Sequence, residues 1–269
     1  MKKLTLTFLI ILFTLTSNIV WSADFNKGWE AYNNGDYATA LREFKPLAEQ
    51  GNADAQYNLG VMYDQGRGVT QDFKTAVKWY TLSAKQGDAD AQYNLGYSYR
   101  HGEGVPQNDK TAVKWYTLAA EQGDDFAQNN LGMMYFKGLG VPKDYKTAVM
   151  WFTSSAEQGN KNSQTSIGYM YLNGYGVPKD YKSSLKWFKL GAEQGSVNAH
   201  GNLSILYENG YGVLQDNIYA HMWANIAASN GNEDAAKRRD IVAKKMTSAE
   251  IAEAQKLARE CVAKNYKGC

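Results

Sequence analysis

Apolar and small residues recur along the chain with a period of 36 residues, which is the pattern of a repeat protein. In each period, a first apolar set has the spacing i, i+4, i+5, i+8 and falls on one face of a helix. Its first copy is Ala55, Leu59, Gly60 and Tyr63. A second set falls on one face of another helix, and its first copy is Ala76, Trp79, Tyr80 and Ala84. Each period therefore predicts two helices that each bury one face, with the large rings as interlocking core.

Glycines and capping residues mark where these helices begin and end. Gly51 and its equivalents are each followed by Asn, Asp or Ser, whose side chains accept hydrogen bonds from the free amides of a helix start. A Gly-x-Gly-Val sequence, first at Gly66–Val69, interrupts each unit and is followed by a second capping residue such as Asp72. A glycine in the left-handed conformation is the usual way to close a helix. Each unit is therefore predicted to be helix A, loop, helix B.

These boundaries predict one elongated all-α solenoid between two caps. The first helix pair turns at Asn34-Gly35-Asp36, lacks the long glycine loop and resembles a tetratricopeptide repeat. The expected division is a signal peptide at 1–23, a short first pair at 24–51, five full repeats at 52–87, 88–123, 124–159, 160–195 and 196–231, and a helical C-terminal cap at 232–269.

The N-terminus has the organisation of a secretory signal peptide. Lys2 and Lys3 precede an apolar run that ends near Leu15. Threonines interrupt this run, which falls short of the roughly 20 apolar residues of a membrane span. Cleavage after Ser22 and cleavage after Ala23 both fit the sequence. We expect a periplasmic or secreted protein with no membrane span after cleavage.

The charge balance argues against a nucleic-acid partner. The chain has 29 basic and 27 acidic residues, and loss of the leader removes two lysines, so the mature protein is formally neutral. Basic residues gather only in the tail, at Lys237, Arg238, Arg239, Lys244 and Lys245. Acidic residues are interleaved with them, which favours the solvated face of a helix.

The repeat pattern A-x-A-x-x-x-L-G-x-x-Y-x-x-G-x-G-V, with a capping Asp or Asn, then A-x-x-W-Y and A-x-x-G, resembles the Sel1-like repeat, a relative of the tetratricopeptide repeat. The resemblance covers 52–231 and implies a right-handed α/α superhelix that holds a protein or peptide partner. Ser163 replaces the usual second alanine and Ser204 the helix glycine. We expect those two units to pack less tightly.

The sequence lacks the metalloprotease, phosphate-loop and nucleophile-elbow motifs, and its three histidines have no metal-ligand spacing. Ser183-Ser184-Leu185-Lys186 matches S-x-x-K, and some cysteine-rich secreted members of the resembled family are associated with penicillin binding or β-lactamase activity. However, Ser183 fills the position of Thr75 and its equivalents, and the companion motifs are absent. We expect a non-enzymatic interaction scaffold without cofactor or metal; a penicillin-interacting or glycan-active hydrolase is the alternative.

The positions of helix A that vary between repeats are 54, 57, 58, 61, 64 and 65 and their 36-residue equivalents. They lie away from Leu59 and Tyr63, on the side that lines the concave groove in tetratricopeptide-type solenoids. Aromatic residues beside Asn, Arg and Lys suit a binding hot spot for a peptide backbone or carboxylate. The alternative is that these side chains only pack against neighbouring A helices. The predicted partner-binding residues are Tyr57, Asn58, Val61, Tyr93, Asn94, Tyr97, Arg100, His101, Asn130, Met133, Phe136, Lys137, Tyr169 and Leu172.

The chain has two cysteines, Cys261 and Cys269, and we predict a disulfide between them. An exported protein meets an oxidising environment, and an even cysteine count without metal partners favours pairing. A bridge within the chain would fasten the end of the cap over the last repeat. A bridge between two chains stays open as an alternative, and so does the oligomeric state.

Overall fold

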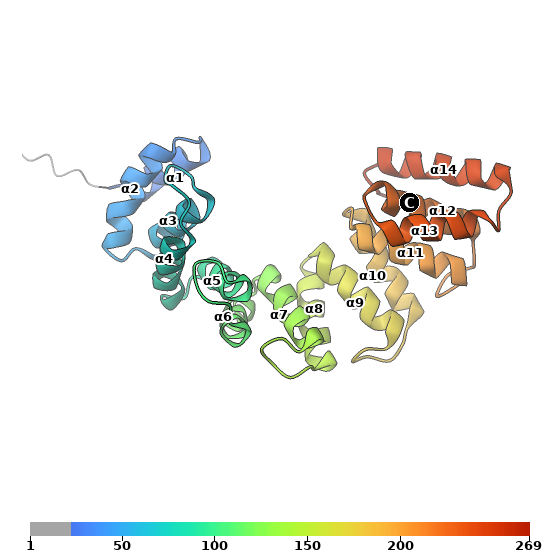
Figure 1. Cartoon of the computed structure of the whole chain (residues 1–269), viewed down its shortest axis with the longest axis horizontal. Helices are drawn as coiled ribbons and strands as arrows, with labels where there is room; N and C mark the ends of the chain where they lie inside the picture. Colours follow the sequence, from blue (N-terminus) through green and yellow to red (C-terminus); the bar gives the residue numbers. More distant parts are fainter. Residues whose placement is uncertain (1–22) are drawn as a thin grey trace, which may run out of the picture.

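The computed structural model of the protein describes residues 23–269, so the predicted signal peptide lies outside the described residues except for its last position. This part of the chain forms fourteen α-helices and no strand. The helices pair in chain order along an open arc, with α1 and α2 at one end and α13 and α14 at the other (Figure 1). The predicted all-α solenoid of helix-loop-helix units is therefore confirmed.

Each full repeat contributes an odd-numbered A helix and an even-numbered B helix. The first pair is α1 (Phe25–Asn33) and α2 (Tyr37–Glu49), and the last is α13 (Glu233–Ala243) and α14 (Ser248–Ala263). The A helices are α3 (Ala53–Gln65), α5 (Ala89–His101), α7 (Asp125–Lys137), α9 (Lys161–Asn173) and α11 (Val197–Asn209). The B helices are α4 (Phe73–Lys85), α6 (Asp109–Glu121), α8 (Tyr145–Glu157), α10 (Tyr181–Glu193) and α12 (Asn217–Ser229).

The predicted capping residues hold the helix ends. Asn52 accepts a hydrogen bond from the Ala55 amide at 2.7 Å and so begins α3. Gly66, with φ of 66°, ends the same helix in the left-handed region. The second loop glycine has another role: a Cβ on Gly104 would overlap the Phe73 carbonyl of the preceding repeat. The glycine loop therefore both turns the chain and lets neighbouring repeats approach closely.

The glycine inside each A helix makes room for a ring from the B helix. A Cβ on Gly60 would lie 2.6 Å from the Tyr80 ring, and Gly132 faces Phe152 in the same way at 2.8 Å. The fifth repeat instead has Ser204 and Ala224 at these two positions, and both are fully buried. The two exchanges compensate, because a serine fits where the opposing ring is missing.

The two serines that replace the usual small residues are both buried but differ in hydrogen bonding, since the Ser204 hydroxyl has no hydrogen-bond partner within residues 23–269. The Ser163 side chain is fully buried, and its hydroxyl lies within hydrogen-bond distance of the Asn129 side-chain oxygen at 2.9 Å and of the Ser155 hydroxyl at 2.8 Å, either of which can accept its one proton. Hydrogen bonding thus replaces the apolar contact that alanine makes elsewhere. Ser204 is also fully buried, for the reason given above.

Tryptophans and buried glutamines join one repeat to the next. Trp115 of α6 packs against the apolar cluster of α4 and α5, as expected for interlocking core. Gln92 donates to the Ala84 carbonyl at 3.1 Å and accepts from Gln122 of the next B helix at 2.8 Å. In the fifth repeat the position of Gln92 is occupied by His200, whose Nε2 lies 3.0 Å from the Ala192 carbonyl.

The C-terminal cap carries the predicted disulfide. Cys261 and Cys269 are bridged within the chain, with their α-carbons 5.7 Å apart. The loop between them places the Tyr266 ring 4.8 Å from the ring of His200. The bridge therefore fastens the end of the chain to the fifth repeat. None of the helices in residues 23–269 is long and apolar enough to cross a bilayer.

Candidate partner-binding groove

The A helices carry the predicted binding positions on a shared surface, which we call the A-helix groove. We define this groove by the residues at variable helix A positions that line the pockets between successive A helices. They are Tyr93, Asn94, Tyr97, Met133, Phe136, Thr165, Ser166, Tyr169, Asn198 and Asn202. Because α11 contacts both α9 and α13, the surface runs on into the C-terminal cap. Two of its pockets have distinct chemistry.

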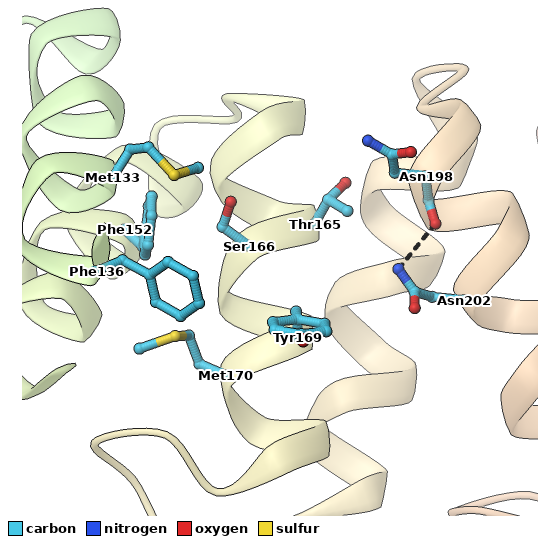
Figure 2. A pocket seen from close by; sticks show the side chains of 9 residues that line it. All are labelled: Met133, Phe136, Phe152, Thr165, Ser166, Tyr169, Met170, Asn198 and Asn202. Atoms are coloured by element: carbon cyan, nitrogen blue, oxygen red, sulfur yellow. Dashed lines mark hydrogen bonds between the residues drawn. The ribbon is translucent and has the colours of Figure 1, made fainter. Parts of the chain in front are cut away.

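The first, the apolar pocket, has a volume of about 240 Å³ and lies between α7, α9 and α11 (Figure 2). Met133 and Phe136 of α7 face Tyr169 of α9. Asn198 and Asn202 of α11 supply amide groups on the opposite side (Figure 2). The Asn202 amide nitrogen donates to the Asn198 backbone carbonyl at 2.9 Å (Figure 2). The pocket can thus surround an apolar side chain, while the Asn202 amide oxygen and the Asn198 amide face a bound peptide backbone.

Aromatic rings extend the apolar pocket along the solenoid. Phe136 lies 5.4 Å from the Tyr145 ring and 6.0 Å from the Tyr175 ring, and these two tyrosines stack at 4.9 Å. Tyr169 is 39% exposed beside them, and burial raises the pKa of its hydroxyl above the ordinary tyrosine value. The prediction from the sequence included Phe136 and Tyr169 but missed Tyr145 and Tyr175. Tyr175 follows the loop glycine and stacks on the preceding B helix, an arrangement repeated by Tyr211 on Tyr181 at 4.4 Å.

The second, the acidic pocket, has a volume of about 430 Å³ and lies between α3 and α5. The predicted residues Tyr93, Asn94 and Tyr97 line it. Two carboxylates that the prediction missed, Asp64 and Glu103, also line it. Position 64 is one of the variable helix A positions, so the signal for Asp64 was present in the sequence.

Several predicted groove residues also make contacts within an A helix or between neighbouring A helices. Asn58 is only 6% exposed, and its amide donates to the Asp54 carbonyl at 2.8 Å. Burial is the main cause that raises the pKa of Tyr57 to about 12, and a hydrogen bond to Asn94 opposes the shift. Burial likewise raises the pKa of Tyr93, and a hydrogen bond to Asn130 opposes this shift. Asn58 is thus bonded within its own helix, whereas Tyr57 and Tyr93 reach the next A helix, and Tyr93 and Asn94 line the acidic pocket as well.

The remaining predicted residues divide between apolar packing and the open surface. Val61 and Leu172 pack against the apolar clusters of their repeats. Arg100 pairs with Asp109 at 3.2 Å, and the exposed His101 lies 4.2 Å from the Tyr97 ring. Lys137 is exposed. Phe126, 56% exposed and 6.0 Å from Tyr93, was missed although it occupies a variable position.

The S-x-x-K sequence is part of a helix cap. The Ser183 hydroxyl donates to the Asp180 carboxylate at 2.6 Å, as Thr147 does to Asp144. The hydrogen bond from the Ser183 hydroxyl is the largest of the contributions that lower the pKa of the Asp180 carboxyl. Lys186 lies over the Trp187 ring, 5.7 Å from its centroid. The serine thus has a structural partner in the repeat. Within residues 23–269, no group of three or more His, Cys, Asp or Glu side chains is placed to hold a metal ion.

A solenoid with a lined groove along its A helices defines a helical repeat protein of the tetratricopeptide type. The family model described as Sel1 repeat matches residues 53–88, 89–124, 125–160, 162–196 and 197–232. The chain therefore belongs to the Sel1 repeat family, whose members generally mediate protein–protein interaction and typically are non-catalytic scaffolds.

Two solved structures with this fold are similar over most of the chain. A Sel1 repeat protein from Oxalobacter formigenes is 36% identical, with 81% of this chain and 86% of that chain covered and a TM-score of 0.76. A protective antigen present in uropathogenic Escherichia coli strains is 35% identical, with 90% of this chain covered and a TM-score of 0.77. The chain spans 53% of the length of that antigen. No curated protein matches the sequence significantly.

Proposed function

We propose that the protein is a non-enzymatic scaffold of the bacterial envelope or secreted space that binds a segment of a partner protein in the A-helix groove. The observation that carries the proposal is the apolar pocket, which three successive A helices build around Met133, Phe136 and the half-exposed Tyr169. A clustered set of aromatic and apolar side chains beside polar amides is typical of a binding hot spot.

Export is supported by two independent features. The N-terminal residues have the pattern of a secretory signal peptide. At the other end of the chain, Cys261 and Cys269 form a disulfide, a bond that persists in oxidising compartments. The proposed partner is therefore a protein met in the periplasm or outside the cell.

Photocrosslinking in the exporting cell tests the groove directly. A benzoylphenylalanine at position 169 should form one discrete adduct with a partner protein, because Tyr169 lies at the edge of the apolar pocket. The matched control places the same group at Met150, which is exposed on α8 and does not line the pocket. Adding Met133→Lys to the position 169 variant should remove the adduct while the helical circular dichroism stays unchanged. Equal adducts from positions 169 and 150, or no adduct at 169, would exclude the groove as the binding surface.

A further inference from the structure

The second full repeat differs from the others at one buried position of its A helix. The equivalent residues are Met62, Met134, Met170 and Leu206, and the second repeat has Ser98. Ser98 is only 4% exposed and lines the acidic pocket. Within residues 23–269, its hydroxyl has no hydrogen-bond partner. The small side chain leaves space where the other repeats are filled and places an unpaired polar group in it.

Aromatic rings and carboxylates form the walls of this space. The rings belong to Phe73, Tyr80, Tyr93 and Tyr97. The carboxylates are those of Asp64, at the end of α3, and Glu103, in the loop after α5. No basic side chain is among the described residues that line the pocket, and in this part of the chain neither carboxylate takes part in an ion pair.

The two carboxylates repel each other in a partly dry setting. Burial, and then the charge of Glu103, raises the pKa of Asp64. A cation between them would relieve this repulsion, and the tyrosine faces would attract the same cation. The apolar pocket, in contrast, has no charged side chain in its lining. The two pockets therefore select different side chains.

We propose that the acidic pocket binds the guanidinium group of an arginine side chain presented by the partner protein. The inference rests on the proposed function, since it assigns a partner residue to the same groove. A guanidinium fits better than an ammonium because its planar fork can bond both carboxylates and stack on a tyrosine face. Its remaining N–H groups can donate to the Ser98 hydroxyl, which is unpaired in the free protein.

A titration with single-residue probes tests the pocket without a known partner. N-acetyl-arginine methylamide is added to isotope-labelled mature protein, and the backbone amides of Tyr97 and Ser98 are followed by NMR. The arginine probe should give saturable shifts. The lysine analogue should bind several-fold more weakly, and the norleucine analogue should give no saturable shift.

Two kinds of variant separate charge from space. Asp64→Asn with Glu103→Gln should weaken arginine binding by about tenfold for each charge removed. Ser98→Met introduces the residue found in the first, third and fourth repeats, so it should fold normally, fill the pocket and abolish the saturable shifts. Asp54→Asn removes an exposed acid outside the pocket and should leave binding unchanged.

Unchanged binding in Ser98→Met, equal binding of the norleucine probe, or no saturable shift in the wild type would overturn the arginine assignment. Thermal melting of each variant shows whether a loss of binding reflects unfolding; if Ser98→Met unfolds, the charge variant decides. The crosslink from position 169 is independent of this pocket. If the crosslink forms and arginine does not bind, the groove stands and the arginine assignment fails. If arginine binds and the crosslink does not form, the acidic pocket binds a guanidinium group, but its assignment to a partner protein fails together with the proposed function.

Discussion

In the third full repeat, Gly132 fits beneath Phe152 only because it has no side chain. A Cβ at position 132 would lie 2.8 Å from Cδ1 of Phe152, which is closer than carbon atoms pack. We therefore predict that Gly132→Ser destabilises the protein by overpacking, although serine is the better helix former. The fifth repeat provides the compensating change, since it has Ser204 opposite Ala224.

The expected magnitudes follow from the packing. Overpacking a close contact costs about 1–3 kcal/mol, while exchange of glycine for serine in a helix returns about 0.5 kcal/mol. Phe152→Ala alone removes a ring that is 1% exposed and should cost about 3–5 kcal/mol. In the double variant the serine no longer meets the ring. The loss of unfolding free energy in the double variant should therefore be smaller than the sum of the two single losses by about 1–3 kcal/mol.

Urea unfolding of the mature protein, followed by far-UV circular dichroism, measures the four free energies of this cycle. Equal m-values across the set are required, because a long repeat array can unfold in parts. Ser204→Gly is the matched control: the same two residues are exchanged, but no ring opposes them. The change loses about 0.5 kcal/mol of helix propensity, and it also removes a buried hydroxyl that has no partner within residues 23–269, so a small net effect is expected. Additive single effects, or a Gly132→Ser variant more stable than the wild type, would refute the reasoning.

Two further predictions concern the fifth repeat and its cap. Burial lowers the pKa of His200 below its usual 6.5, which favours the neutral imidazole in the folded protein. The stability that this residue contributes is therefore fully present above the pKa of the unfolded state and is lost as the pH falls below that value. His200→Gln, which introduces the glutamine of the other repeats, should therefore reduce the difference in unfolding free energy between about pH 7.5 and pH 5.5. Burial also lowers the pKa of His221, so part of the pH dependence remains in the variant. An unchanged difference would contradict the role of His200. Replacing Cys261 and Cys269 with serine should lower the unfolding free energy by about 2–3 kcal/mol for a bridge of eight residues separation. Identical urea midpoints for the oxidised wild type and this variant would show that the bridge does not constrain the cap.

The helices could be read from the sequence because their ends depend on local chemistry. Asn52 caps α3 through a bond to an amide three residues away, and Gly66 ends the helix through its own backbone angle. Both signals lie within one turn of the boundary that they set. The same signals recur in every repeat, so chance agreement at one position carries little weight.

The binding surface was harder to predict because exposure depends on neighbouring repeats. Tyr57 and Tyr169 are both on variable helix A positions, yet Tyr57 is directed to Asn94 of the next repeat while Tyr169 is half exposed. The acidic pocket was missed for a related reason. Its space comes from the small volume of Ser98, and its charges come from two different repeats. Comparison of the repeats at position 62 would have revealed the missing volume, although not what surrounds it.

The pairing of His200 with Tyr266, together with Ser204 opposite Ala224, makes the fifth repeat differ in kind from the four before it. The four repeats before it have the same glutamine, which in the second repeat bonds the preceding repeat through the Ala84 carbonyl, so a duplicated interior unit would meet a matching contact. The fifth repeat matches its cap instead. Insertion or removal of one interior repeat would therefore keep these contacts, whereas the fifth repeat could be exchanged only together with the cap.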